Sequence, residues 1–444
     1  MNDWLIRNAD IVNEGKRFHG DLRLRGGRIE QIGGALDARP GEREFDAAGR
    51  LLVPGMIDDQ VHFREPGLEH KADFHTESRA AVAGGVTTFF EMPNSKPTTT
   101  DYAALADKHQ RAAQKSLANY AFYFGATNDN LELIRNLDPH EACGIKIFMG
   151  ASTGNMLVDD PMTLDGIFRD APVNVVTHCE DSPIIELNLA SERLKYGDAI
   201  PVERHPYIRS RESCIKSTLL AISLARRHGT RLHVLHISTA DELALFEPGP
   251  LDGRRITAET CVHFLHYSEA DYATKGNLIK CNPAIKSAHD RDAIIAALND
   301  GRISVLATDH APHTLAEKAQ NYEKAPSGLP LVQFVLQCAL ERWFDGQVPI
   351  ETLVERAMHA PAKLFNVRER GFIREGYRAD LALIDLKKPQ TVVREAVLSK
   401  CGWSPFEGTT FRSSIAATWV NGHLAYRDGR LDDSQLGQKV EFDR

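Results

Sequence analysis

The sequence lacks paired cysteines. Its seven cysteines are scattered singly over 444 residues, with no CxxC pair among them. Disulfide frameworks and cysteine-based zinc sites need cysteines that are clustered or regularly spaced. We therefore expect reduced thiols and a cytoplasmic protein.

The sequence also lacks a membrane segment and a basic block. No apolar run reaches the roughly 18 residues that a membrane helix needs. The stretch MNDWLIRNADIVNEG has no basic region followed by an apolar run, so it predicts no secretory signal. A net charge of −8 without a cluster of Lys and Arg argues against nucleic-acid and membrane-surface partners. The hydrophobic content of 42% is ordinary for a soluble globular protein.

Both ends of the sequence show the two-residue alternation of short β-strands. WLIRNADIVNE and GDLRLRGGRIEQIGG lie near the start, and YRADLALIDL and SSIAATWVNGHLAYRDGRL lie near the end. Asn421-Gly422 and Asp428-Gly429 are strong hairpin signals. We predict a small composite β-sandwich domain formed by residues 1–53 and 368–444.

Between residues 54 and 367, short apolar strands alternate with stretches of helical periodicity. After a first strand at 55–62, the candidate strands are GVTTFFEM, YAFYFGAT, CGIKIFMG, PVNVVTHCE, RLHVLHIST, RITAETC and ISVLATDHA. This rhythm over about 255 residues predicts an α/β fold, a (β/α)8 TIM-type catalytic barrel. The alternative is a doubly wound open sheet. No GxGxxG follows the first strand, and polar residues end many strands rather than one, which argues against the open sheet.

Polar side chains stand at the ends of these predicted strands. In a parallel barrel the carboxyl ends of all strands meet at one mouth, so residues far apart in sequence converge there. The candidates are His62, Arg64, Asn94, Lys146, His178, His236, Asn282, Asp309 and His313. A single histidine at a strand end is usually structural. Three on different strands, together with an aspartate, predict a metal site.

Strand alternation separates the two histidines of RLHVLHIST. Val234 and His236 share one face, and His233 lies on the other face, which we assign to the helix layer. We therefore predict that His236 points to the mouth and that His233 is structural.

Lys146 in GIKIFMG points either into the barrel or toward the helices. On the outside it would extend its ammonium group to solvent. Inside, burial would lower its pKa and favour the neutral amine. A neutral amine can add CO2 to become a carbamate, which can bridge two cations.

Ten stretches, taken in order, carry a resemblance to a known family. They are PGMIDDQVHFREPG, GGVTTFFEMPNSKPT, GIKIFMGASTGNM, THCED, HVLHIST, TAETCVHFL, CNPAIK, ATDHAPH, SKCGWSPFEG and WVNGHLAYRDGRL. With them the chain resembles dihydroorotases of the amidohydrolase superfamily over essentially its whole length. Arg64 with Asn94 points to dihydroorotase within that superfamily. The resemblance implies zinc-dependent, reversible hydrolysis of dihydroorotate to N-carbamoyl-aspartate in pyrimidine biosynthesis.

The resemblance also implies metal ligands. Lys146 would be an N6-carboxylysine that bridges two zinc ions. His62 and Asp309 would hold one ion, and His178 and His236 the other. Imidazole and carboxylate are suitable zinc donors.

The remaining roles implied by the resemblance concern the substrate. Arg64, Asn94 and Asn282 would bind the substrate carboxylate, and His313 would help fix the ring. Asp309 would also act as the proton shuttle. We also expect a homodimer or higher homo-oligomer.

The chain departs from the family pattern at Gln60. The usual Asp-x-His-x-His reads Asp58-Asp59-Gln60-Val61-His62 here. Glutamine is a weaker zinc donor than imidazole. We therefore expect one of three states for this metal site: it is empty, its ion exchanges readily, or the Gln60 amide oxygen coordinates the ion. Asp58, on the face of Gln60 and His62 by strand alternation, or Asp59, on the opposite face, offers compensation.

Two alternatives remain open from the sequence. A hydantoinase or allantoinase uses the same ligands, but its substrates generally lack the ring carboxylate that Arg64 would bind. A non-catalytic homologue that serves as a scaffold for a transcarbamoylase is favoured only by Gln60. The segment at 311–330 is either a mobile lid over the mouth or an ordinary surface connection.

Overall fold

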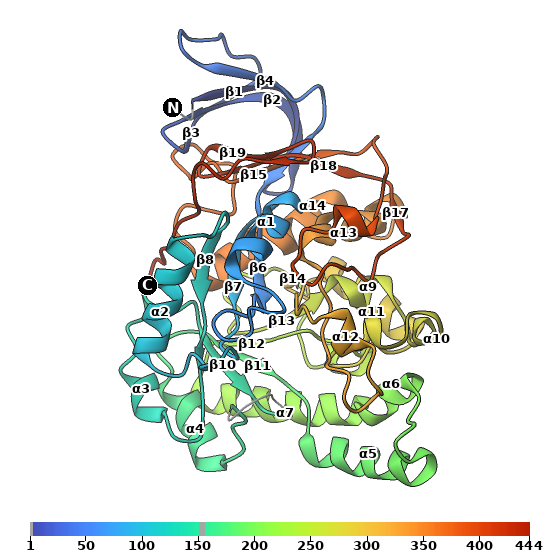
Figure 1. Cartoon of the computed structure of the whole chain (residues 1–444). Helices are drawn as coiled ribbons and strands as arrows, with labels where there is room; N and C mark the ends of the chain where they lie inside the picture. The colour runs from blue at the N-terminus through green and yellow to red at the C-terminus, as the bar shows by residue number, and fades with distance from the viewer. Residues whose placement is uncertain (1–2, 151–155) are drawn as a thin grey trace.

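The computed structural model describes residues 3–150 and 156–444. Its centre is a closed barrel of parallel strands (Figure 1). In chain order the barrel strands are β6 (Met56–Val61), β7 (Val86–Glu91), β8 (Asn119–Phe122) continued by β9 (Phe124–Gly125), β10 (Ile145–Phe148), β11 (Val175–His178), β12 (Leu232–Val234), β13 (Ile256–Cys261) and β14 (Val305–Ala307).

Closure of the barrel joins its first and last strands. The His62 amide donates to the His310 carbonyl at 2.7 Å, and Val61 forms a parallel bridge with His310. The predicted (β/α)8 barrel is confirmed, and the open doubly wound sheet is wrong, because an open sheet leaves its two edge strands unpaired.

Helices surround the barrel and also follow some strands as short turns. The helices are α1 (Phe74–Ala83), α2 (Tyr102–Ala113), α3 (Leu131–Arg135), α4 (Pro161–Asp170), α5 (Ser182–Tyr196), α6 (His205–Ile208), α7 (Arg211–His228), α8 (Ala240–Leu243), α9 (Val262–His266), α10 (Tyr272–Lys275), α11 (Ala288–Asp300), α12 (Leu315–Lys318), α13 (Val335–Phe344), α14 (Ile350–Val354) and α15 (Ala360–Phe365).

Local sequence signals set the ends of the longest helix, α7. The Ser210 side chain accepts a hydrogen bond from the Ser213 amide at its start. Arg226, Arg227 and His228 lie in its last turn, where cations favour the helix dipole. Gly229 then adopts a left-handed φ of 68°, which ends the helix.

Both ends of the chain form the predicted composite β-domain. Its nine-stranded sheet contains β1 (Trp4–Asn13), β2 (Lys16–Arg25), β3 (Arg28–Gly33), β4 (Arg43–Asp46), β5 (Leu51–Pro54), β15 (Leu381–Asp385), β18 (Ser414–Val420), β19 (His423–Arg427) and β20 (Arg430–Leu431). Strand β5 joins the two parts, since it pairs parallel with β1 and antiparallel with β15. A small separate pair is formed by β16 (Gln390–Thr391) and β17 (Thr410–Phe411). The boundaries at 53/54 and 367/368 stay predictions.

The two predicted hairpin turns are present in the β-domain. Asn421 and Gly422 have φ values of 50° and 76°, and Asp428 and Gly429 have values of 45° and 85°. Positive φ at both central residues suits the right-handed twist of the flanking strands. These turns fix the register of β18, β19 and β20.

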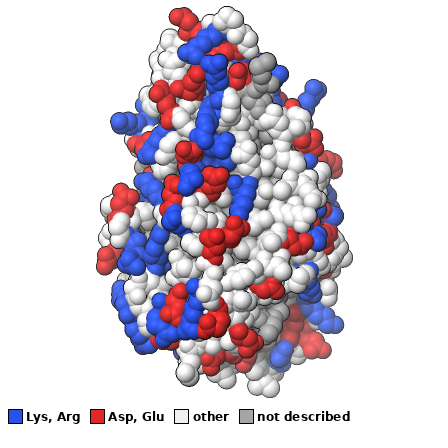
Figure 2. Space-filling view, turned by 90° about the vertical axis from the view of Figure 1, so that its left-hand side faces the viewer, with Lys and Arg blue, Asp and Glu red and all other residues white. Residues whose placement is uncertain are grey.

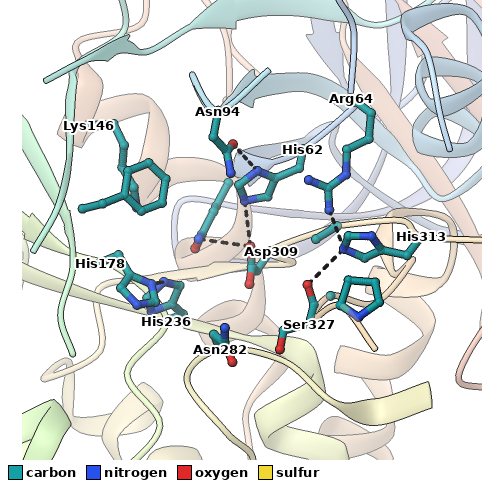
Figure 3. A pocket seen from close by; sticks show the side chains of 15 residues that line it. His62, Arg64, Asn94, Lys146, His178, His236, Asn282, Asp309, His313 and Ser327 are labelled. Carbon is teal, nitrogen blue, oxygen red and sulfur yellow. Dashed lines mark hydrogen bonds and ion pairs between the residues drawn. The ribbon is translucent and has the colours of Figure 1, made fainter. Parts of the chain in front are cut away.

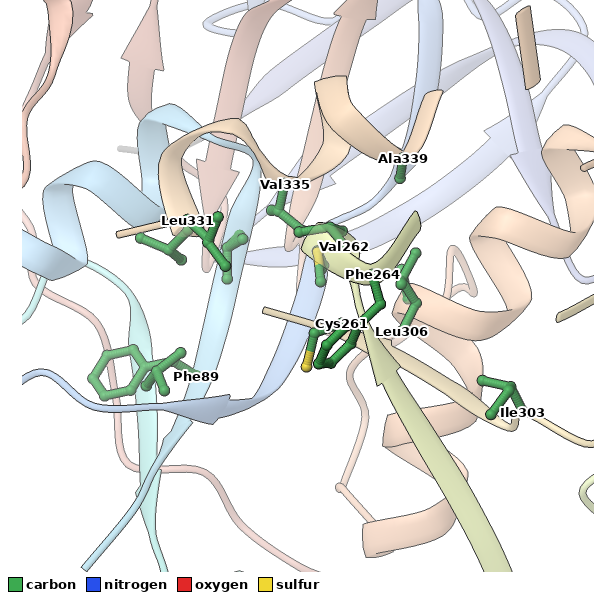
Figure 4. Packing of buried hydrophobic residues seen from close by; sticks show 14 of the residues in the cluster. Phe89, Cys261, Val262, Phe264, Ile303, Leu306, Leu331, Val335 and Ala339 are labelled. Carbon is green, nitrogen blue, oxygen red and sulfur yellow. The ribbon is translucent and has the colours of Figure 1, made fainter. Parts of the chain in front are cut away.

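The main core lies between the barrel strands and their covering helices. Figure 4 shows Phe89 of β7, Leu306 of β14, Phe264 of α9 and Val335 of α13 among the buried side chains of this layer. At roughly 1.5–3 kcal/mol for each fully buried large apolar side chain, this layer supplies most of the stabilisation that holds the mouth rigid. No helix of the described residues is long and apolar enough to cross a membrane. Figure 2 shows acidic and basic side chains interspersed on one face of the molecule.

A buried polar network joins the barrel to the β-domain. Arg370 donates to Asp380 and also to Asn421 Oδ1 at 2.8 Å. Asp380 also accepts from the Asn421 amide at 2.7 Å and from Asn119 of β8 at 3.2 Å. Arg370 and Asp380 are both buried, so each charge is compensated by the other.

Asp380→Ala should destabilise the protein by about 3–5 kcal/mol, because it leaves the Arg370 guanidinium buried and unpaired. Urea unfolding followed by circular dichroism measures the change. As a control, Glu44→Ala removes the exposed partner of Arg7 and should cost no more than about 1 kcal/mol. Equal effects of the two substitutions would contradict the role of the network.

Candidate active site

The mouth of the barrel holds a pocket with a volume of about 180 Å³ (Figure 3). All nine residues predicted at the strand ends line the pocket, and so does Gln60, which replaces a histidine of the family pattern. They are Gln60, His62, Arg64, Asn94, Lys146, His178, His236, Asn282, Asp309 and His313. The convergence expected from the carboxyl ends of parallel strands is therefore present, while the role of each residue stays a prediction.

Strand alternation was a poor guide near the mouth. His233 faces the barrel interior and not the helix layer, since its Nε2 lies 3.4 Å from Asp59 of the non-adjacent strand β6. His236 reaches the mouth because it follows the end of β12 with a φ of 42°, which turns the chain. The prediction for His236 holds, and the assignment of His233 to the helix layer is wrong.

The first strand is irregular where the family pattern is altered. The pairing of β6 with β7 shifts register between Asp58 and Val61. Asp58 accepts a hydrogen bond from Thr308 Oγ1 at 2.6 Å, and neither Asp58 nor Asp59 lines the pocket. Gln60 does line it, and its Nε2 donates to Asp309 Oδ1 at 3.2 Å.

His62 and Asp309 form one side of the mouth. His62 Nδ1 lies 2.8 Å from Asn94 Oδ1, so this nitrogen carries the proton and donates it. His62 Nε2 lies 3.1 Å from Asp309 Oδ1. Burial lowers the pKa of His62 and favours the neutral ring. A lone pair then faces a carboxylate oxygen, an arrangement that a proton or a metal cation between them would satisfy.

His178 and His236 form the opposite side. His178 Nε2 lies 2.9 Å from Glu180, which also accepts from Arg209. Burial opposes ionisation of Glu180, but Arg209 and His178 outweigh it and lower the Glu180 pKa to about 2. This carboxylate therefore holds the His178 proton on Nε2 and leaves Nδ1 with a lone pair, 3.0 Å from His236 Nε2. His236 Nδ1 is buried without a hydrogen-bond partner in the described residues.

Lys146 also lines the pocket at the mouth. It is 1% exposed, and burial lowers its pKa to about 8. Its Nζ lies 4.6 Å from the centre of the Phe148 ring, and within the described residues it makes no hydrogen bond or ion pair. A buried amine beside three neutral imidazoles and one carboxylate is a donor set that fits a divalent cation, once the amine is carboxylated.

Arg64 and His313 line the outer part of the pocket. Arg64 Nε donates to the Pro312 carbonyl at 3.1 Å, and its Nη2 lies 3.0 Å from His313 Nε2. Burial lowers the Arg64 pKa to about 10, although Asp309 opposes this. In the described part of the chain Arg64 has no carboxylate within ion-pair distance. A buried cation with a free edge toward the pocket is suited to an anionic ligand.

Backbone of the segment at 311–330 completes the pocket. Pro326, Ser327 and Gly328 line it. The Lys318 ammonium group anchors this backbone, since it donates to the Pro326 carbonyl at 2.9 Å and the Gly328 carbonyl at 3.0 Å. The segment therefore covers part of the mouth, and whether it moves stays a prediction.

Sequence reasoning missed two residues that support the site. Glu180 orients His178, and Trp403 Nε1 donates to the His313 carbonyl at 2.7 Å. Both stand in motifs of the sequence, THCED and SKCGWSPFEG. The proximity of Glu180 to His178 was a usable signal, but nothing local connects Trp403 with His313. The end of GIKIFMGASTGNM, residues 151–155, lies outside the described residues.

Comparisons with known proteins agree on the family of this chain, and the relatives differ in their named activity. The model of the amidohydrolase family matches residues 51–425. A dihydroorotase from Halobacterium salinarum is 36% identical over 410 residues, which cover 91% of this chain and 92% of that protein. An allantoinase from Bacillus velezensis is 32% identical over 433 residues, with 96% and 94% covered.

Solved structures agree with these relatives. An L-hydantoinase (dihydropyrimidinase) from Arthrobacter aurescens superposes with a TM-score of 0.94 at 27% identity, covering 99% of this chain and 100% of that one. The match to the family model extends over most of the chain, and the barrel and its mouth agree with it. The chain belongs to the amidohydrolase family and is a cyclic amide hydrolase.

Proposed function

We propose that the protein is a dihydroorotase, which hydrolyses dihydroorotate reversibly to N-carbamoyl-aspartate. The observation that carries this proposal is the buried guanidinium of Arg64, which lines the pocket without a carboxylate partner in the described residues. Dihydroorotate carries a ring carboxylate, and the planar guanidinium group matches a carboxylate with two parallel hydrogen bonds. Burial strengthens such a charged pair relative to water.

The metal proposed for this mouth is zinc, with one or two ions per chain. His62 and Asp309 would hold one ion with Gln60 beside them, and His178 and His236 would hold the other. Lys146 would bridge them as N6-carboxylysine, formed when its neutral amine adds CO2 and releases a proton. When bound, zinc supplies Lewis acidity, which activates water near neutral pH and polarises a carbonyl oxygen.

The side chains of the mouth divide the remaining work. Arg64, Asn94 and Asn282 bind the substrate carboxylate, and the buried Asn282 Oδ1, which lacks a partner in the described residues, is free to accept from the ring. His313 lies against Arg64 and helps fix the ring.

Asp309 has the proton-transfer role in this proposal. Hydrolysis forms a C–O bond from water and breaks the ring C–N bond. Asp309 takes a proton from the attacking water and delivers it to the departing ring nitrogen. In the reverse direction the same groups close the ring.

The names of the relatives favour a second candidate, an allantoinase or hydantoinase. The substrates of these enzymes generally lack the ring carboxylate, so Arg64 would have little to bind. A scaffold for a transcarbamoylase has only Gln60 in its favour, and the other proposed ligands remain.

We expect the purified protein to hydrolyse dihydroorotate with a kcat/KM at least about 100-fold above those for hydantoin and allantoin. A fold-change of this size corresponds to about 2.7 kcal/mol, within the range for one charged hydrogen-bonded pair. Parallel assays of the three substrates under one condition measure it. A preference for hydantoin or allantoin would transfer the proposal to the second candidate.

Arg64→Gln should lower kcat/KM for dihydroorotate by about 30- to 150-fold, because a charge-assisted contact contributes roughly 2–3 kcal/mol. Steady-state kinetics with metal analysis on the same samples measures the effect. Metal content should not change. The control, Arg79→Gln, removes a guanidinium of α1 that pairs with the exposed Asp433 and does not line the pocket, so it should leave the kinetics unchanged. Loss of metal from Arg64→Gln would refute the role given to Arg64.

Exhaustive chelation should remove at least about 99% of the activity, since an activated water is needed for amide hydrolysis at neutral pH. Addition of Zn²⁺ with bicarbonate should restore it. Activity assays together with elemental analysis before and after dialysis follow both steps. Full activity in protein whose mouth has been emptied of metal would contradict the proposed mechanism.

A further inference from the structure

A second group of possible ligands lies inside the barrel, apart from the pocket. Asp59 of β6, His233 of β12 and Glu259 of β13 each offer one ligand atom, and these atoms lie within 4.8 Å of one another. All three side chains are fully buried. None of them lines the pocket at the mouth.

Four polar atoms of this cluster make no hydrogen bond within the described residues. Both carboxylate oxygens of Asp59, Nε2 of His233 and Oε2 of Glu259 are buried without a hydrogen bond in the described residues. Leaving one buried polar group unsatisfied costs about 1–3 kcal/mol, and more when the group is charged. One ligand atom from each of the three residues lies within 4.8 Å of the other two, which indicates a binding site for a cation.

The two distances from His233 fit a metal better than a hydrogen bond. His233 Nε2 lies 3.4 Å from Asp59 Oδ2 and 3.6 Å from Glu259 Oε2. A hydrogen bond between these atoms would bring them to about 2.7–3.2 Å. Ligands that surround a metal tetrahedrally at about 2.0–2.2 Å are about 3.3–3.6 Å apart.

The hydrogen bond at His233 Nδ1 is also typical of a metal ligand. Thr257 Oγ1 donates to the Leu232 carbonyl at 3.2 Å, and it lies 2.8 Å from His233 Nδ1. Because the hydroxyl proton is engaged, Thr257 accepts from Nδ1–H. One proton is thereby held on Nδ1. Without a cation, burial opposes the charge of His233, but Asp59 and Glu259 outweigh it and raise its pKa to about 9, so Nε2 also carries a proton. A bound cation would replace that proton and use the Nε2 lone pair.

We propose that Asp59, His233 and Glu259 bind one divalent transition-metal cation inside the barrel. Two carboxylates supply two negative charges, which a divalent cation neutralises in surroundings that include the Phe365 ring, centred 6.0 Å from that of His233. One imidazole and two carboxylates are donors of the kind that Zn²⁺, Mn²⁺ and Fe²⁺ accept.

This ion is structural and distinct from the metal of the proposed function. Glu259 Oε1 accepts from the His236 amide at 3.3 Å, so the ion also steadies the backbone beneath a residue of the mouth. Because the cluster is fully enclosed, the cation enters during folding. It is released only when the barrel opens, whereas ions at the mouth exchange with the solvent.

Metal counting after chelation tests the proposal. Wild-type protein produced with zinc, manganese or iron in the medium is dialysed against a strong chelator, and the metal left is measured by plasma mass spectrometry. One equivalent per chain should remain in the folded protein and leave it in denaturant. Asp59→Asn and Glu259→Gln should retain less than about a tenth of an equivalent. Wild-type protein that retains no equivalent would overturn the proposal, whatever its activity.

The matched control is Glu242→Gln. Glu242 is also buried, but its oxygens accept from the Thr218 and Thr239 hydroxyls at 2.9 and 2.8 Å, contacts that an amide oxygen can partly keep. This variant should hold its equivalent. If it loses the metal as completely as Asp59→Asn, the cluster is not the ligand set.

Anomalous diffraction from wild-type crystals covers the case in which the variants fail to fold. A peak at the absorption edge of the retained metal, between Asp59, His233 and Glu259, supports the proposal. Peaks confined to the mouth overturn it. Activity that disappears with the chelator-sensitive ions belongs to the mouth, so the proposed function and this inference fail independently.

Discussion

Burial of two cationic side chains at one mouth is the constraint on which the chemistry of the site depends. Lys146 and Arg64 are both enclosed, and among the described residues neither has an ion-pair partner. An uncompensated buried charge costs several kcal/mol, and here burial lowers the pKa of both groups. A fold can keep such buried groups where a bound ligand compensates for the cost of burial. The proposed ligands of Lys146 are CO2 and a metal ion, and the proposed ligand of Arg64 is a carboxylate. The residues whose burial is costly without a ligand are thus those that select the ligand.

Closure of the barrel makes this concentration of polar groups possible. The hydrogen bond from the His62 amide to the His310 carbonyl joins the first strand to the last, and so brings His62 within 3.1 Å of Asp309. The network around Asp380 and Arg370 then fixes the β-domain on the barrel. Rigid strands and packed helices hold the donors in place before any ligand arrives. That preorganisation allows residues from separate strands to act as one site.

Much of the fold and of the mouth could be predicted from the sequence, because strand ends converge in any parallel barrel. The rule needs only the order of the strands, so it nominated His178 and Asp309 correctly as residues of the pocket. Alternation along a strand needs regular geometry, and it failed where the geometry is irregular. The chain turns at His236 with a positive φ, so the direction of His236 did not give that of His233, which faces the interior. The hydrogen bond from Trp403 to His313 could not be predicted, because it joins two segments that no local sequence pattern connects.

Gln60 changes the strength of a donor without changing the charge of the mouth. Glutamine and neutral imidazole are both uncharged, so the electrostatic balance does not depend on this position. The described lining holds one carboxylate, Asp309, and carboxylated Lys146 would add a second negative charge. Together they offset one divalent cation, and a second ion relies on substrate and solvent for its balance. An ion held by His62 and Asp309 beside Gln60 would have a weaker donor where the family pattern has an imidazole, so it would exchange more readily than it would with a histidine at position 60. Asp59, the residue before Gln60, belongs to a different site. The interior cluster offers one cation two carboxylates, and its three side chains are fully buried. By donor strength, charge and access, the cation proposed for the barrel interior would be held more tightly than one beside Gln60.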